Sequence, residues 1–421
     1  MINFVQHMRN FFKPQILLIL ALAFVVRMGY FFSGSGQSIT SRAPWEYQKL
    51  AVHLLKDGVY SYDGKTPSAF RLPLYPLFLD GIYWTTGDIS YKATAQIFLV
   101  QILINCLSIF FLYQIAMSFF SSSTAVWASL LLAINPTQIG LIFTVGPETL
   151  QTLQCVLIAW AALWTFKNPN SIERWSILGF AIGFSLLAKS TFLLLPIFLI
   201  LFFHFILKIR VPYKEMLMLF LCSYLALLPW VIRNERQLGR VVVFEDGMGW
   251  HALYQGTNGV RGVPDPDLPE PLKTYFFDKD PRIGPLSKEM AIQQIEARPW
   301  RYGRFCLERF DYIWFHGDWA EHALRLKDSF YDYISHGDWF AAIGRAFAKI
   351  LELLFMVAAL WGIYAGWIFP EAKILFAIVF YMNIHLLTQG EPRYTAPVIP
   401  CLCILASLGF KDIFSRIQKT A

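Results

Sequence analysis

The sequence predicts an all-α integral membrane protein with about ten transmembrane helices, interfacial helices in the first outer loop and a small polar region on the outer face. Hydrophobic residues make up 56% of the 421 residues and charged residues only 15%, whereas an average soluble domain is about 25% charged. The mean hydropathy is +0.45. Apolar runs of about 20 residues, the length that crosses a bilayer as a helix, recur along the chain.

The N-terminal part begins with a short basic segment and an apolar run, 15–32, which we expect to be retained as the first membrane span. Arg27 lies near the end of that run, where a charge either serves a functional site or snorkels to the interface. Loop 33–72 follows. Residues 45–56 of this loop carry apolar side chains at helical spacing, which favours an amphipathic helix along the membrane surface. The run 74–84 is too short to span and is expected to form a second interfacial or re-entrant helix.

The rest of the chain consists of apolar runs and one long polar stretch. Further membrane spans are expected at about 92–118, 123–142, 147–166, 174–188, 190–208, 215–232, 346–369, 372–388 and 394–410. The polar stretch, 233–338, contains a proline-rich loop and a helical segment around 299–315. These boundaries divide the chain into an N-terminal membrane part, 1–232, the outer polar region 233–338 and the C-terminal membrane helices, 339–421.

The distribution of basic residues predicts the orientation, because Lys and Arg concentrate in cytoplasmic loops. With both termini in the cytoplasm, the cytoplasmic ends of ten alternating spans carry Arg9, Lys13, Lys167, Arg174, Lys208, Arg210, Lys214, Lys373, Lys411, Arg416 and Lys419. The short outward turns carry little more than Lys189 and Arg393. We therefore expect a multi-pass protein of the cell inner (plasma) membrane, with loop 33–72 and region 233–338 together on the outer face.

Several charged residues lie at the outer ends of different spans, so they can converge on one site although they are far apart in the sequence. They are the carboxylates Glu46, Glu148 and Glu391 and the cations Arg71, Lys189, Arg233 and Arg393. Arginine and lysine bind phosphate oxygens, and a carboxylate can act as a general base toward an acceptor hydroxyl or amine. The pattern favours a site for a lipid-linked phosphate at the membrane surface. The alternative is that these charges only bound the spans and pair with one another.

Further polar and aromatic residues belong to the same candidate set. They are Arg27, Tyr47, Tyr75, Asn234, His251, His385 and Tyr394. The histidines are scattered and lack the spacing of a metal site, so no metal-binding cluster is visible and the need for a divalent metal stays open. The net charge of +7 is not concentrated in a basic cluster, which argues against nucleic-acid binding.

With these residues in view, the chain resembles the polytopic membrane glycosyltransferases of the GT-C superfamily, and within it the protein-mannosyltransferase and aminoarabinose-transferase-like family. The resemblance covers nearly the whole chain and rests on the order and spacing of short blocks. These blocks are Tyr47 with Leu50-Ala51 and Leu54-Leu55, Ala69-Phe-Arg-Leu-Pro-Leu-Tyr-Pro-Leu-Phe-Leu79, Asn135-Pro136, Glu148-Thr149, Lys189-Ser-Thr before Leu195-Pro196, Pro229-Trp-Val-Ile-Arg-Asn234, Gly249-Trp with Leu253-Tyr-Gln-Gly256, and Arg393-Tyr with Pro397 and Pro400. The resemblance implies transfer of a sugar from a polyprenyl-phosphate donor, with inversion at the anomeric carbon.

The resemblance also implies a catalytic acid, typically aspartate, in the first outer loop a few positions before the equivalent of Tyr47. Here those positions hold Ala43 or Pro44, and no aspartate precedes Asp57. Three explanations stay open. Glu46 has taken over as the base and as a contact to any metal, another outer-face carboxylate serves, or the chain has lost the standard chemistry.

The leading hypothesis is therefore a hexosyl- or pentosyltransferase of the cell envelope. It would move one sugar from a polyprenyl-phosphate donor to a lipid, glycan or protein acceptor at the outer (extracytoplasmic) face of the membrane. Glu46 is the first candidate for the base, and Arg71, Lys189, Arg233 and Arg393 are the candidates for contacts to the donor phosphate. The alternatives are a non-catalytic homologue that binds lipid phosphate and a transporter or flippase for a lipid-linked saccharide.

Overall fold

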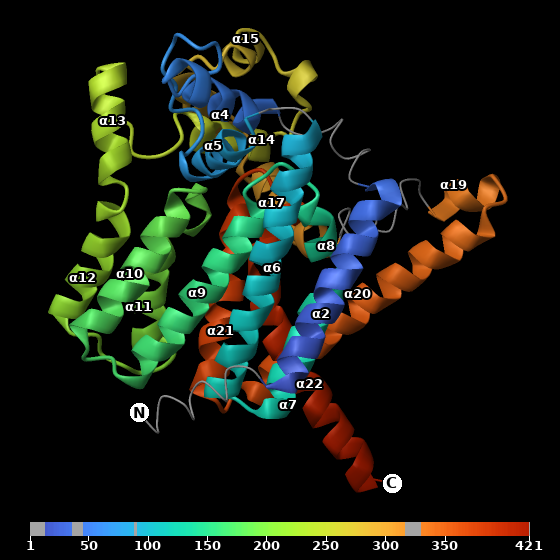
Figure 1. The fold of residues 1–421 in the computed structure, drawn as a ribbon. Coiled ribbons are helices and arrows are strands. Elements are labelled where there is room, and N and C mark those ends of the chain that lie inside the picture. The colour runs from blue at the N-terminus through green and yellow to red at the C-terminus, as the bar shows by residue number, and fades with distance from the viewer. Residues whose placement is uncertain (1–12, 36–44, 88–90, 316–329, 421) are drawn as a thin grey trace.

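The computed structural model describes residues 13–35, 45–87, 91–315 and 330–420, and its elements are helices (Figure 1). In chain order they are α2 (Pro14–Tyr30), η1 (Phe31–Ser35), α4 (Trp45–Asp57), α5 (Leu74–Thr86), α6 (Tyr91–Phe119), α7 (Ser122–Ile134), α8 (Pro136–Ile142), α9 (Glu148–Lys167), α10 (Ile172–Leu186), η2 (Ser190–Phe192), α11 (Leu195–Phe205), α12 (Tyr213–Leu225), α13 (Leu228–Leu238), α14 (Met248–Thr257), η3 (Asp265–Asp267), α15 (Leu272–Phe277), α16 (Ile283–Ala297), α17 (Pro299–Phe315), α19 (Phe330–Ser335), α20 (Trp339–Gly366), α21 (Pro370–Tyr381), η4 (Met382–Leu387), η5 (Pro392–Val398) and α22 (Ile399–Thr420). Within the described ranges, the β-type pairing is limited to an isolated bridge between Ser61 and Pro67. The predicted all-α membrane fold class is confirmed.

The number of membrane spans expected from the sequence pattern is tested by the lengths of the described helices. Six of the described helices are long and apolar enough to cross a bilayer, and the count rises to eight if each of two bent helix pairs is one span. The expected ten spans are not confirmed. The difference comes from α10 and α11, which have 15 and 11 residues, because a helix needs about 20 residues to cross the hydrocarbon core.

The two bent pairs are α7 with α8, at 51°, and α12 with α13, at 43°. The first break lies at Asn135-Pro136, where the proline ring prevents α7 from continuing. The side chain of Asn135 then caps α8 by accepting a hydrogen bond of 3.0 Å from the backbone N–H of Gln138. In the second pair, Pro229 lies in the first turn of α13, a position that proline favours.

The first outer loop and the long polar region lie at the same end of the bundle, where α4 and α5 are next to α14 and α15 (Figure 1). A hydrophobic cluster joins them, in which Phe70 packs with Tyr254, Leu272 and Ile283. The helices predicted at 45–56, 74–84 and 299–315 are observed as α4, α5 and α17. Two segments that are distant in the sequence therefore form one polar layer at one end of the bundle, which we call the outer layer after the orientation expected from the sequence.

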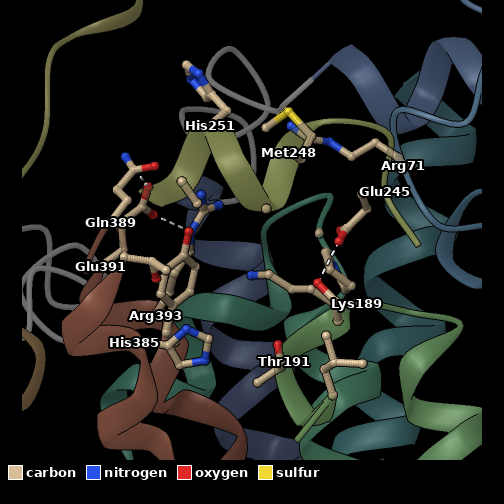
Figure 2. A pocket seen from close by; sticks show the side chains of 18 of the residues that line it. Arg71, Lys189, Thr191, Glu245, Met248, His251, His385, Gln389, Glu391 and Arg393 are labelled. Atoms are coloured by element: carbon tan, nitrogen blue, oxygen red, sulfur yellow. Dashed lines mark hydrogen bonds and ion pairs between the residues drawn. The ribbon is translucent and has the colours of Figure 1, made fainter. Parts of the chain in front are cut away.

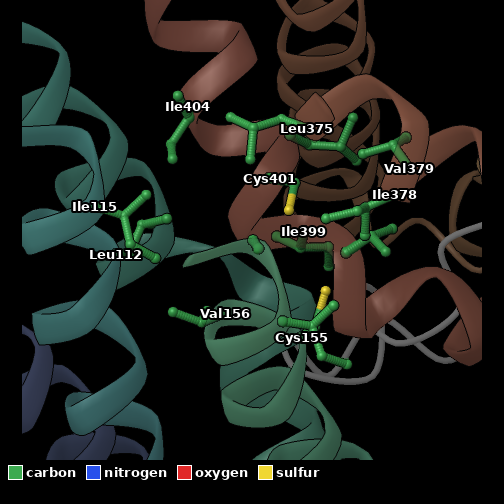
Figure 3. Close-up of a cluster of buried hydrophobic side chains, with 14 of the residues drawn as sticks. Leu112, Ile115, Cys155, Val156, Leu375, Ile378, Val379, Ile399, Cys401 and Ile404 are labelled. Atoms are coloured by element: carbon green, nitrogen blue, oxygen red, sulfur yellow. The ribbon is translucent and has the colours of Figure 1, made fainter. Parts of the chain in front are cut away.

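The core below the outer layer fixes the helices that carry the site (Figure 3). Cys155 of α9, Ile378 of α21 and Cys401 of α22 are buried in one hydrophobic cluster. Helices α20 and α22 cross closely at Gly362 and Gly409. The crossing depends on these glycines, because a Cβ atom at either position would overlap the facing backbone. The close crossing holds α22 in place, and η5 leads directly into that helix.

Candidate functional site

A cavity of about 370 Å³ lies between the outer end of the bundle and the outer layer. Figure 2 shows Lys189 and Glu245 on one side of it, and His385, Glu391 and Arg393 on the other. Its charged lining residues are Glu46, Arg71, Glu148, Lys189, Glu245, Asp265, Glu391 and Arg393. They come from at least six separate segments, so the site exists only in the folded chain.

Ten of the fourteen residues proposed from the sequence line this cavity. They are Glu46, Tyr47, Arg71, Glu148, Lys189, His251, His385, Glu391, Arg393 and Tyr394. The other four, Arg27, Tyr75, Arg233 and Asn234, do not line it.

Arg27 is fully buried between helices of the bundle. Its Nε donates a hydrogen bond of 3.0 Å to Oδ1 of Asn105, and its Nη1 donates one of 2.8 Å to the carbonyl oxygen of Ala133. Arg27 therefore links α2 to α6 and α7. Tyr75 is also buried, and its hydroxyl donates a hydrogen bond of 3.2 Å to Oε1 of Gln101. Both side chains thus satisfy polar groups inside the bundle.

Arg233 and its neighbour Asn234 connect α13 to the outer layer. Arg233 donates hydrogen bonds to the carbonyl oxygens of Ser68, at 2.7 Å, and Tyr60, at 3.0 Å. Asn234 is buried and donates a hydrogen bond of 2.8 Å to the carbonyl oxygen of Val242. These hydrogen bonds attach α13 to the backbone of two loops, the one before Arg71 and the one before Glu245, and so help to position these two cavity residues.

The centre of the cavity wall on the bundle side is a carboxylate between two cations. Glu148 starts α9 and is only 3% exposed. Nζ of Lys189 and Nη1 of Arg393 each lie 3.8 Å from its Oε1. Lys189 also lies 4.3 Å from the ring centroid of Tyr394. Burial lowers the pKa of the Lys189 ammonium, and the Glu148 carboxylate opposes that effect. Two cations therefore converge on one buried carboxylate in this wall.

The other oxygen of Glu148, Oε2, lies against the backbone of Gly146, where a Cβ atom would overlap it. The position of this carboxylate therefore depends on a glycine two residues earlier. A carboxylate in the first turn of a helix is also stabilised by the helix dipole. The same Gly-Pro-Glu sequence thus serves both the start of α9 and the placement of the acid.

The second wall comes from the segment that joins α21 to α22. Arg393 forms an ion pair with Glu391, and Nε2 of Gln389 lies 3.5 Å from Oε1 of the same carboxylate. The rings of His385 and Tyr394 lie 5.0 Å apart. Nε2 of His385 is buried and has no hydrogen-bond partner among the described residues. This wall therefore supplies Arg393, whose charge is paired with Glu391, and the imidazole of His385, whose buried Nε2 is available for a hydrogen bond.

Glu46 holds the outer layer together above the cavity. Arg71 donates two hydrogen bonds to its Oε2, at 3.0 Å and 2.6 Å, and Lys279 donates one to its Oε1. Burial acts to raise the pKa of Glu46, but the two cations outweigh it and lower this pKa to about 2. Arg71 also lies 5.9 Å from the ring centroid of Tyr47. Both oxygens of Glu46 are thus occupied, and its basicity is low.

His251 faces the cavity from α14. Its ring stacks on that of Phe276 at 5.1 Å, and Nε2 lies 3.4 Å from the amide of Gln255. Burial is the largest effect on this histidine and, with the charges of Arg71 and Lys279, lowers its pKa to about 4. His251 is therefore neutral at pH 7.

Three charged residues of the site were not proposed from the sequence: Glu245, Asp265 and Lys279. Glu245 lines the cavity, and its Oε2 accepts a hydrogen bond of 2.6 Å from the hydroxyl of Ser190. Burial and the charge of Glu46 raise the pKa of Asp265. The signal for Glu245 was a pair of acids, Glu245-Asp246, shortly after a predicted span. Asp265 and Lys279 lie in an ordinary polar stretch and gave no local signal.

The structure gives no metal-binding group among the residues it describes: no three His, Cys, Asp or Glu side chains are close enough to hold a metal ion. Ala43 and Pro44, which occupy the positions of the expected aspartate, lie outside the described residues.

Comparison with known proteins gives a match to a family model and matches to solved structures. Residues 75–232 match the family described as dolichyl-phosphate-mannose-protein mannosyltransferase. The fold is similar to that of the Archaeoglobus fulgidus oligosaccharyltransferase, in crystal structures with Zn and sulfate and with a tethered acceptor peptide containing the NVT sequon. In both, the TM-score is 0.55 and the identity 16%, over 95% and 97% of this chain and 49% and 51% of the other. The chain thus spans about half the length of that protein.

A weaker structural similarity is found to ArnT from Cupriavidus metallidurans, bound to undecaprenyl phosphate. Here the TM-score is 0.44 and the identity 13%, over 94% of this chain and 77% of the other. No curated protein sequence matches the chain. The family match and the shared fold confirm the resemblance that the short sequence blocks suggested. The chain is a multi-pass membrane protein whose fold is similar to that of the oligosaccharyltransferase, and its residues 75–232 match the model of the protein-mannosyltransferase family.

Proposed function

We propose that this protein is a membrane glycosyltransferase that moves one sugar from a polyprenyl-phosphate donor to an acceptor, with inversion at the anomeric carbon. The observation that carries the proposal is the pair of cations, Lys189 and Arg393, that flank buried Glu148 in the cavity. The family that matches residues 75–232 is described as using dolichyl-phosphate-mannose, a polyprenyl-phosphate sugar.

The two cations are the proposed contacts to the donor phosphate. A phosphate that enters between them would satisfy both charges, and arginine offers two parallel N–H groups to its oxygens. The bundle side of the cavity also includes the apolar residues Leu193, Leu194 and Ile384. Leu194 is 43% exposed at the bundle surface, so a prenyl chain can leave the cavity toward the lipid at this point.

Arg71 and Glu46 have a supporting role in this proposal. Arg71 is committed to Glu46, which also binds Lys279. A carboxylate with a pKa of about 2 accepts a proton poorly at neutral pH. We therefore place Glu46 in the framework of the site. Glu148 and Glu391 balance the charges of Lys189 and Arg393 before the donor arrives and are the remaining carboxylates first proposed as bases.

The cavity lies at one end of the bundle, in the outer layer. The excess of basic residues at the opposite ends of the spans supports a cytoplasmic location for both termini in the inner (plasma) membrane. Transfer would then take place at the extracytoplasmic face, and a lipid, glycan or protein of that compartment would be the acceptor.

The test uses the full chain in proteoliposomes with a panel of radiolabelled polyprenyl-phosphate hexoses and pentoses, beginning with mannose, and with membrane extracts as the source of acceptor. We expect label to move into the lipid, glycan or protein fraction. Lys189→Met should weaken donor binding at least tenfold, because a charge-assisted contact to phosphate contributes about 1.5–3 kcal/mol. Lys49→Met, at an exposed position of α4 away from the cavity, is the matched control. Wild-type protein that transfers none of the donors would refute the proposal.

One observation favours a second candidate, a homologue that binds lipid phosphate without turnover. The expected aspartate of the first loop is absent, and Glu46 has both oxygens bound to cations. The same proteoliposomes distinguish the two candidates. Saturable binding of the donors that depends on Lys189, with no labelled product from any of them, would select the binding protein.

A further inference from the structure

The carboxylates of the cavity differ in how they are compensated. Glu46 is bound by two cations, Glu148 lies 3.8 Å from two others, and Glu391 is paired with Arg393. Each of these three acids therefore has at least one cation at ion-pair distance.

Two further carboxylates line the cavity, Asp265 and Glu245, and none of the described cations lies within ion-pair distance of either. Asp265 is exposed, whereas Glu245 is partly buried and hydrogen-bonds to Ser190, the residue next to Lys189. We therefore consider Glu245. Its Oε2 accepts the 2.6 Å hydrogen bond from Ser190. Its Oε1 has no hydrogen-bond donor among the described residues, and the side chain is only partly buried in the cavity wall. One oxygen is therefore fixed by a neutral hydroxyl, and the other is free to take a proton from a bound molecule.

The backbone around Glu245 is held in place on both sides. The N–H of Asp246 donates a hydrogen bond of 2.9 Å to the carbonyl oxygen of Ala69, and the Asp246 carboxylate pairs with Arg240. Gly247 has φ +79, and a Cβ atom there would meet the backbone of Gly284 at 2.8 Å. The loop is thus fixed to the first outer loop and to α16, so Glu245 is presented by a rigid segment.

Ser190 also places Glu245 relative to the donor site. Ser190 directly follows Lys189, one of the two cations assigned to the donor phosphate, and both line the cavity. A base in this reaction must approach the acceptor hydroxyl close to the sugar, and the sugar is attached to the phosphate. Glu245 is therefore hydrogen-bonded to Ser190, the residue next to the phosphate-binding Lys189.

We propose that Glu245 is the general base that activates the acceptor, with Ser190 as its positioning residue. This inference rests on the glycosyltransferase function proposed above. In the step, Oε1 of Glu245 takes the proton of the acceptor hydroxyl while the acceptor oxygen forms its bond to the anomeric carbon. The bond between that carbon and the phosphate oxygen breaks, and its electron pair leaves with the polyprenyl phosphate. Lys189 and Arg393 bind the charge that develops on the leaving phosphate.

The experiment compares Glu245→Gln, Ser190→Ala and the control Glu235→Gln in the proteoliposome assay. Glu235 is an exposed glutamate of α13 outside the cavity. We expect Glu245→Gln to lower kcat about 100-fold or more, the usual contribution of a general base, with KM for the donor changed less than threefold. The acid limb of the kcat/KM pH profile should disappear in this variant. Ser190→Ala should lower kcat about tenfold, Glu245→Asp should restore part of the activity, and Glu235→Gln should match wild type.

Binding of unlabelled polyprenyl phosphate and the thermal midpoint of each variant show whether the protein is folded and its donor site intact. Wild-type transfer together with near-wild-type kcat in Glu245→Gln would overturn the role of Glu245 and leave the proposed function standing. Loss of polyprenyl phosphate binding in folded Glu245→Gln would also overturn it, because a base is not needed for donor binding. Absence of transfer by wild type would overturn both.

Discussion

The ion pairs of Glu46 give the most quantitative prediction. This residue joins Arg71, on the first outer loop, to Lys279, between α15 and α16, and its side chain is 23% exposed. Its pKa falls from 4.5 to about 2 in the folded protein, and one pKa unit corresponds to about 1.4 kcal/mol. The ionised carboxylate therefore contributes about 3 kcal/mol to stability at pH 7. Glu46→Gln should remove this contribution and leave two cations facing one uncharged amide.

The pH dependence has a definite sign. Because the folded pKa is below the unfolded one, the contribution of Glu46 is complete above pH 4.5 and is lost as the pH falls toward 2. The stability difference between wild type and Glu46→Gln should fall from about 3 kcal/mol at pH 7 to about 1 kcal/mol at pH 3. Denaturant unfolding in detergent micelles, followed by tryptophan fluorescence at both pH values, measures this difference.

A double-mutant cycle with Lys279→Met isolates the ion pair itself. We expect the double variant to lose less stability than the sum of the single losses, with a coupling energy of about 1–3 kcal/mol, because removal of one partner leaves the other with nothing to bind. Additive losses within about 0.5 kcal/mol, or a wild-type advantage that does not change between pH 7 and pH 3, would refute the reasoning.

Two further predictions concern glycines. Gly146→Ala should displace the Glu148 carboxylate, since the new Cβ atom overlaps its Oε2. The affinity for the donor, which Lys189 and Arg393 are proposed to bind, should then differ from that of wild type in the proteoliposome assay. The control Gly81→Ala, in open space on α5, should keep the wild-type affinity, and an unchanged affinity in Gly146→Ala would contradict the position assigned to Glu148. Gly362→Ala should force α20 and α22 apart, because its Cβ atom overlaps the carbonyl of Leu405; the thermal midpoint should fall well below that of Gly303→Ala, an open position on α17, and equal midpoints would show that the crossing is not tight.

The comparison of Lys189 with Lys279 shows how far sequence reasoning reached. Lys189 stands out in the sequence, because it lies between two long apolar runs. A charge at such a break is expected at the membrane surface, since a charge inside the bilayer is costly. Lys279 lies in a polar stretch with other charges nearby, so nothing local distinguishes it. Its partner Glu46 is more than 200 residues away, and only packing of α15 and α16 on the first outer loop brings the two together.

The composition and the lengths of the apolar runs determined the membrane class, the all-α architecture and the set of outer-end charges, because these depend on local hydrophobicity and on the need to satisfy the backbone inside lipid. The tertiary structure alone decided how those charges pair. Arg233 and Arg27 bind backbone carbonyl groups, Glu46 lies between two cations, and one oxygen of Glu245 is open to the cavity. Pairing of this kind depends on distances between segments far apart in the chain, and no local pattern in the sequence encodes those distances.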